Sequence, residues 1–178
     1  VDFTKSDYYI PSAVYNTSGV LYKPPSYYNS LESYNHVDTK KFFVRLNSSA
    51  FSFPHYIFSD TLNGPAINSS GNNLRLFTGK TYTFERTDNG HAFNIGSAWK
   101  TNNFEGLSVT SSSTSNTDNK GVGSILSGGT LVFTVPDDFE ETTMKYYCVL
   151  HQGMIGDLDI ANGGPFGRMN KKQIEDLL

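Results

Sequence analysis

The sequence predicts an all-β fold, and its composition, the spacing of its strand-like segments and the turn residues between them support this. The chain has 178 residues, among them 11 tyrosines and 13 phenylalanines, and only 17% are charged. Aromatic and hydroxyl-bearing residues suit pleated strands, whereas glycine, asparagine and serine suit turns. Because no helical pattern lies between the strand-like segments, a sandwich of two sheets or a barrel is expected.

The strands are predicted in chain order, each from an apolar run or from strict alternation. Phe51 and Phe53 alternate with serines before Pro54, which predicts a short strand that ends at the proline. Tyr82 and Phe84 point to one face of their segment, and the residues between them point to the other. The other predicted strands are 41–46, 72–76, 79–86, a segment in which Phe93 and Ile95 alternate, 130–135, 144–149 and 156–160.

Two extensions and one long loop complete the predicted organisation. Residues 1–38 are expected to form an extended N-terminal arm, because prolines and Tyr-Asn-Ser clusters break any helical period. The sandwich is expected over residues 39–162, with a Ser-, Thr-, Asn- and Gly-rich surface loop at 108–129. The tail at 163–178 is expected to contain one short helix, with Asn170 as its cap. Arm and tail pack either on this domain or on a neighbouring chain.

Length and charge exclude several classes of function. The length predicts one domain with extensions. The net charge of −3 and the pI of about 5.8 predict no basic surface for nucleic acid. No run of 18 apolar residues is present, so no membrane span is expected. The single cysteine excludes an intrachain disulfide.

Soft metal-ligand side chains are concentrated in one short segment. Cys148, His151 and Met154 follow each other at three-residue steps, just before the last predicted strand. A thiolate, an imidazole and a thioether are the ligand types of a mononuclear copper site of the electron-transfer kind. On a tight loop these steps can turn all three side chains towards one point. Such a site needs one more imidazole from elsewhere in the fold.

His91 is the first candidate for this additional ligand, because it lies beside an alternating strand. His36 in the expected arm and His55 after Pro54 are the alternatives. Zinc is the competing metal, but a thioether is a poor zinc ligand and structural zinc sites favour more thiolates. The sequence therefore predicts one copper ion held by His91, Cys148 and His151, with Met154 as a weak axial ligand.

With these residues in place, the chain resembles the cupredoxins, the blue-copper β-sandwich family, over about residues 72–160. The Cys-x2-His-x2-Met spacing is similar to the short ligand loop of amicyanin. The resemblance implies a Greek-key sandwich, equatorial ligands at His91, Cys148 and His151, an axial ligand at Met154, and one-electron transfer with a redox partner protein. The chain departs from the family at Ala92, where many cupredoxins have an asparagine that ties the two ligand loops together.

A second, looser resemblance implies a different function. Residues 79–84, 90–93 and 146–154 are similar to cupredoxin-like modules in structural proteins of marine bacteriophages. This implies a structural subunit of a virion, filament or surface assembly, with a stabilising metal or none, and neighbours bound through the arm and tail. The expected location is outside the cytoplasm, or in a virion or extracellular assembly. An enzyme is not expected, because four protein ligands leave no open position for a substrate.

Overall fold

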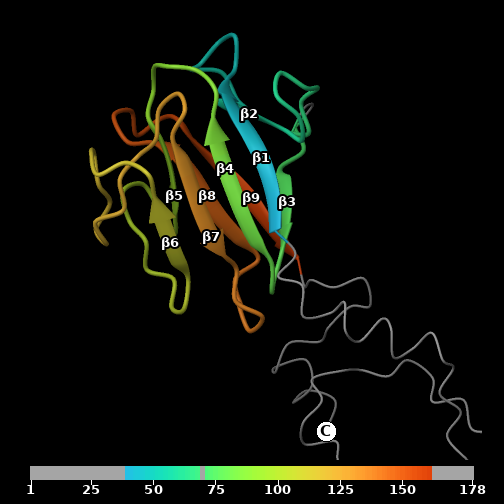
Figure 1. Ribbon diagram of the computed structural model, residues 1–178, viewed down its shortest axis with the longest axis vertical. Helices are drawn as coiled ribbons and strands as arrows, with labels where there is room; N and C mark the ends of the chain where they lie inside the picture. The colour runs from blue at the N-terminus through green and yellow to red at the C-terminus, as the bar shows by residue number, and fades with distance from the viewer. Residues whose placement is uncertain (1–38, 69–70, 162–178) are drawn as a thin grey trace, which may run out of the picture.

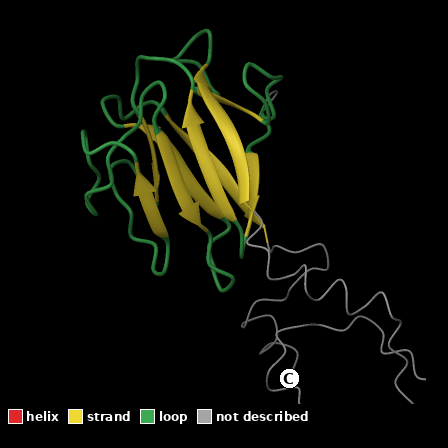
Figure 2. Cartoon of the chain, in the orientation of Figure 1, coloured by secondary structure: helices red, strands yellow, loops and turns green. Residues whose placement is uncertain are grey.

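The computed structural model describes residues 39–68 and 71–161, and within them all regular structure is β. Figure 2 shows this part as strands and loops without a helix. The predicted all-β class is therefore confirmed. The expected arm at 1–38 and the expected helical tail at 163–178 lie outside the described residues. No helix that could cross a membrane occurs in the described part.

The strands form two sheets that lie face to face (Figure 1). The first sheet has the order β2-β1-β4-β7-β6, with β1 at Thr39–Leu46, β2 at Tyr56–Ser59, β4 at Thr81–Arg86, β6 at Ser108–Ser111 and β7 at Thr130–Thr134. The second has the order β3-β9-β8-β5, with β3 at Leu74–Phe77, β5 at Phe93–Gly96, β8 at Thr143–Cys148 and β9 at Ile155–Ala161. Two pairs, β1–β4 and β3–β9, are parallel and the rest antiparallel.

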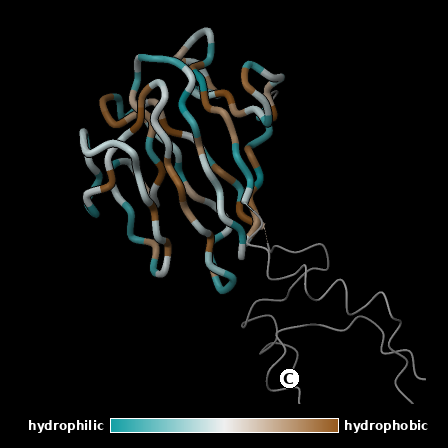
Figure 3. The backbone as a smooth tube through the Cα atoms, viewed as in Figure 1, coloured by the Kyte–Doolittle hydropathy of each residue, from teal (hydrophilic) through white to brown (hydrophobic). Residues whose placement is uncertain are grey.

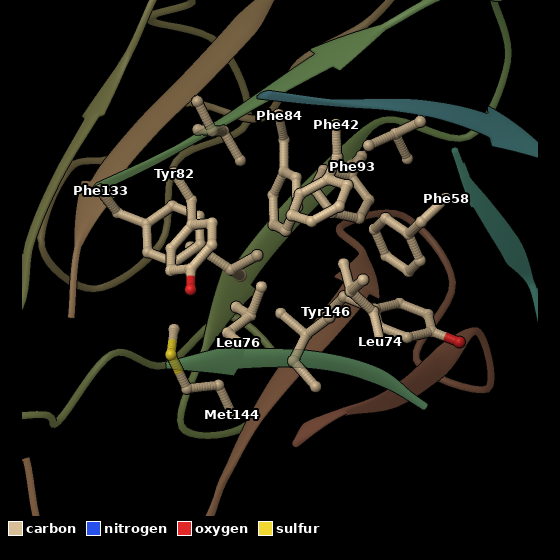
Figure 4. Close-up of a cluster of buried hydrophobic side chains, with 14 of the residues drawn as sticks. Phe42, Phe58, Leu74, Leu76, Tyr82, Phe84, Phe93, Phe133, Met144 and Tyr146 are labelled. Carbon is tan, nitrogen blue, oxygen red and sulfur yellow. The ribbon is translucent and has the colours of Figure 1, made fainter. Parts of the chain in front are cut away.

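Alternating side chains from both sheets form the core between them, and Figure 3 shows the matching alternation of hydropathy along the strands. On β4, Tyr82 and Phe84 are buried, as their alternation predicts, and Arg86 lies on the same buried face. Phe84 lies at the centre of an aromatic cluster (Figure 4). Its ring centroid is 5.2 to 6.0 Å from those of Phe42, Phe58, Phe93 and Phe133.

The predicted strand at Phe51 and Phe53 is wrong. Both side chains lie in the loop between β1 and β2, where they are 69% and 52% exposed. Asn47 closes this loop, because its backbone N–H donates to the His55 carbonyl at 3.1 Å and its side-chain amide donates to the Pro54 carbonyl at 2.9 Å. The strand therefore begins after the proline, at β2, and the alternation before it belongs to a surface loop.

The prediction of a long surface loop at 108–129 is only partly correct, because the segment contains a strand and a buried residue. β6 at its start pairs with β7, although its serines and threonines give no apolar signal. Near its end Ile125 is fully buried and forms a backbone bridge with Phe93. These two anchors hold the segment against both sheets.

Candidate metal centre

The loop from Cys148 to Met154 joins β8 to β9 and is closed by its own backbone hydrogen bonds. The Cys148 N–H donates to the Met154 carbonyl at 2.9 Å. The His151 N–H donates to the Cys148 carbonyl at 3.4 Å, and the Met154 N–H donates to the His151 carbonyl at 2.9 Å. Each three-residue step of the sequence is thus one turn of backbone with its ends close together. This gives the Cys-x2-His-x2-Met spacing its physical reason.

His91 reaches the same place from the neighbouring strand. β5 pairs with β8 so that Phe93 lies opposite Cys148, and the Val149 N–H donates to the Ala92 carbonyl at 3.2 Å. Gly90 and His91 both have left-handed backbone, with φ of +82° and +50°. For a residue other than glycine this conformation costs roughly 1–2 kcal/mol. The surroundings must therefore hold the His91 turn in place.

The three side chains form a compact triangle of ligand atoms. Nδ1 of His91 lies 3.0 Å from Nδ1 of His151, and Sγ of Cys148 lies 3.8 and 3.5 Å from these two nitrogens. The point equidistant from the three atoms is about 2 Å from each, and bonds from a metal to imidazole or thiolate are about 2.0–2.3 Å long. The triangle thus fits one ion of the size of copper or zinc.

The two other candidate histidines are not part of this triangle. His55 is buried, and its Nδ1 lies 3.0 Å from the Ala50 carbonyl. His36 lies outside the described residues. Among the described histidines, cysteine and carboxylates, the group that could hold a metal ion is His91, Cys148 and His151. The structure therefore brings together three of the four residues predicted as ligands, with the first-ranked histidine among them.

Met154, the fourth predicted ligand, is fully buried in the core cluster at the end of the loop. Its backbone closes the loop on Cys148. Its role as an axial ligand stays a prediction.

Burial and charge suit the three residues to metal binding. Cys148 is fully buried, His91 is partly buried and His151 is exposed. Desolvation, the neighbouring His151 and the charge of Arg86 together hold the pKa of His91 below its ordinary value. The imidazole is therefore neutral near pH 7, as a metal ligand must be.

Two aromatic residues near the ligands, the exposed Phe51 and the partly buried Trp99, were not predicted as part of the site. Phe51 presents its ring at right angles to both imidazoles, with centroids 5.3 Å from His91 and 5.6 Å from His151. Trp99, the only tryptophan, donates from Nε1 to the Cys148 carbonyl at 2.9 Å. No local sequence pattern marks either residue, because both contacts depend on the fold.

Arg86 and Tyr56 are further residues of the site that sequence reasoning missed. The Tyr56 hydroxyl donates to the His91 carbonyl at 2.7 Å, and Arg86 donates to the Gly90 carbonyl at 3.0 Å. A signal for Arg86 existed in the sequence, since the alternation of Tyr82 and Phe84 continues to residue 86. The prediction followed only the apolar members of that pattern.

A two-sheet β-sandwich with a His–Cys–His cluster where β5 and β8 meet is a cupredoxin-like architecture. Solved structures similar to this chain include an amicyanin (13% identity over 68% of this chain and 82% of that one, TM-score 0.34) and rusticyanin from Thiobacillus ferrooxidans (15%, 70% and 78%, 0.35). A multi-copper oxidase from Pediococcus acidilactici also matches (12%, 72% and 27%, 0.37).

These identities and TM-scores are too low to indicate a function. No protein-family model matches the sequence, and no curated protein shows a significant match. The chain spans about a quarter of the length of the oxidase. The cupredoxin-like class is therefore defined by the chain's own sheets and ligand cluster.

Proposed function

We propose that this protein binds one copper ion in a mononuclear type 1 site and carries single electrons. The observation that supports this most directly is the triangle of two imidazole nitrogens and one thiolate sulfur around a common point. Two histidines and one cysteine in a trigonal set, with a weak methionine ligand, are typical of blue-copper electron-transfer sites. Copper, when bound, supplies the Cu(I)/Cu(II) couple.

Different residues of the chain give the site the different properties that such a carrier needs. Cys148 keeps its thiolate away from water, because its side chain is fully buried. His151 is exposed, so its ring is the route by which an electron reaches the surface. The hydrogen-bonded ligand loop and the paired strands β5 and β8 keep the ligands in one geometry, which keeps the reorganisation on electron transfer small. These features favour a carrier over an enzyme.

The proposal is tested by loading the full chain with Cu(II) and recording its absorption spectrum. An intense band at about 600 nm is expected from the thiolate-to-copper transition of a trigonal site. Cys148→Ser should abolish the band, and His91→Ala should change it. His55→Gln is the matched control, because His55 lies outside the triangle, and it should leave the band unchanged.

Two results would count against a type 1 copper site. One is a colourless Cu(II)-loaded protein whose copper affinity is the same with serine at position 148. The other is tight Zn(II) binding that Cu(I) does not displace, because the thiolate and thioether should favour the softer ion.

The alternative predicted from the sequence, a structural subunit of a virion, filament or surface assembly, depends on the arm at 1–38 and the tail at 163–178. Both lie outside the described residues, and no observation on the described sandwich favours this function. The redox partner and the location outside the cytoplasm stay predictions.

A further inference from the structure

Arg86 is a fully buried cation next to the His91 turn. It lies at the end of β4, and its side chain is 0% exposed. A charged side chain rarely occurs in a core unless it is paired and hydrogen-bonded. Arg86 is both, since it forms an ion pair with Asp88 and donates to the Val44 carbonyl at 3.1 Å. Its guanidinium also lies over the Tyr56 ring, 5.0 Å from the centroid.

One nitrogen of Arg86, Nη2, points to the ligand turn, whereas Nε is buried without a hydrogen-bond partner among the described residues. Nη2 donates to the Gly90 carbonyl at 3.0 Å and lies 3.4 Å from the His91 carbonyl. The Tyr56 hydroxyl donates to the same His91 carbonyl at 2.7 Å. Burial raises the pKa of Tyr56, and the nearby Cys148 raises it further. The phenol therefore keeps the proton that it donates in this hydrogen bond. Two side chains from the other sheet therefore hold the left-handed turn that carries His91.

The position of Arg86 also gives it an electrostatic role. Its charge contributes to the lowered pKa of His91, after desolvation and His151. Burial lowers the pKa of Arg86 itself, and the nearby Asp88, Tyr56 and Cys148 act in the opposite direction. Opposite charges interact strongly at short range in a medium of low dielectric constant. A buried cation near a metal site disfavours the more positive oxidation state of the metal. The negative charge of Asp88 partly offsets the positive charge of Arg86. The Asp88 side chain lies at the surface, where it is 38% exposed.

We propose that Arg86 and Tyr56 are positioning residues that fix His91 for copper, and that the buried charge of Arg86 raises the reduction potential of the site. This rests on the proposed copper function. The pair connects the His91 turn to β1 and β2, whereas the Val149 N–H bond to the Ala92 carbonyl connects this turn to the cysteine loop. Neighbours of metal ligands tune both affinity and potential in this way.

The electrostatic half of the proposal, the effect of the Arg86 charge on the reduction potential, is tested by voltammetry on copper-loaded variants. Arg86→Met removes the cation and should lower the midpoint potential, whereas Arg86→Lys keeps the charge and should restore most of it. Asp88→Asn should raise the potential, because it removes the offsetting anion and still offers an oxygen to the Leu46 N–H. Asp60→Asn is the matched control, since it neutralises a carboxylate of the exposed Lys40–Asp60 pair. It should leave the potential unchanged.

The positioning half is tested on the metal-free protein by amide relaxation and hydrogen exchange. The amides of Gly90, His91 and Ala92 should be ordered in the parent protein and mobile in Tyr56→Phe and Arg86→Met. In the loaded protein, Arg86→Met should weaken copper binding by about 10- to 100-fold. If Arg86→Met does not fold, Asp88→Asn and Tyr56→Phe still decide the two halves, because Asp88→Asn removes one charge and Tyr56→Phe removes one hydroxyl.

The outcomes separate this inference from the proposed function. A parent protein without the thiolate-to-copper band refutes the proposed function, and the amide measurements then still decide the positioning role. Potentials that stay at the parent value in Arg86→Met and Asp88→Asn, or in Asp88→Asn alone if Arg86→Met does not fold, overturn the electrostatic role. The positioning role is overturned if the amides of the His91 turn are equally ordered in the parent protein, in Tyr56→Phe and in Arg86→Met.

Discussion

The Trp99 indole connects the outer surface of the molecule to the backbone of the ligand loop, and Trp99→Phe tests that connection. Nε1 donates to the Cys148 carbonyl at 2.9 Å, the same oxygen that accepts the His151 N–H at 3.4 Å. Phenylalanine keeps a ring against Ala92, Tyr147 and Val149 but removes the donor. A neutral hydrogen bond contributes about 1 kcal/mol net, which is about fivefold in an equilibrium constant.

We therefore expect Trp99→Phe to lower the free energy of unfolding of the metal-free protein by about 1 kcal/mol, measured by urea denaturation. Copper affinity should fall by up to about fivefold, because the Cys148 carbonyl then keeps only the 3.4 Å bond from the His151 N–H and the first turn of the loop is held less firmly. Competition with a Cu(I) chelator of known affinity measures this. Lys100→Met is the control: it removes the ammonium 4.7 Å from the indole centroid and keeps the indole N–H.

The reasoning fails if Trp99→Phe binds copper as tightly as the parent. It also fails if Lys100→Met weakens binding to the same extent, because the effect then comes from the cation near the ring and not from the hydrogen bond.

Three other predictions follow from the core and the surroundings of the site. Phe51→Ala should let azide reach Cu(II) more readily and shift the absorption spectrum, because it removes the ring that stands at right angles against both imidazoles; an unchanged azide titration would contradict this. Phe84→Ala should lower the free energy of unfolding by about 3–5 kcal/mol, against about 0.5 kcal/mol or less for the 38%-exposed Val132→Ala, in parallel urea denaturations. Since the pKa of His91 is lowered by folding, the unfolded chain takes up a proton at higher pH than the folded one. Metal-free protein should therefore lose stability as the pH falls below the ordinary histidine value of about 6.5, and His91→Gln should flatten this dependence.

Most strands of the two sheets could be predicted, because burial of one face of a strand makes apolar and polar residues alternate along its sequence. β4 and β7 show this pattern clearly, and both lie in the middle of their sheet. β2 was missed because three of its four residues are buried, so it does not alternate. β6 was missed because it consists of polar, half-exposed residues whose main support is pairing with β7. Pairing between distant segments leaves no local periodicity in the sequence.

The same difference between local patterns and long-range contacts decided which residues of the candidate site could be predicted. Cys148, His151 and Met154 could be predicted because their spacing reflects hydrogen-bonded turns within one loop. His91 could be ranked first because it precedes an alternating strand. The contacts of Tyr56 with the His91 turn depend on the position of β2 at the edge of the other sheet, so no motif in the sequence reports them.

The pairing of β5 with β8 also has a consequence for how the protein folds. Cys148 and His151 are three residues apart, but His91 is 57 residues from Cys148. Closing a chain segment of that length costs about 3–4 kcal/mol in entropy. An unfolded chain keeps the Cys–His pair and lacks the third ligand, so under the proposed copper function we expect weak binding to the unfolded chain, which would reduce the net stabilisation by the metal. The backbone bonds between β5 and β8 close the long segment, so that the ligand cluster is assembled by strand pairing before the proposed copper ion binds.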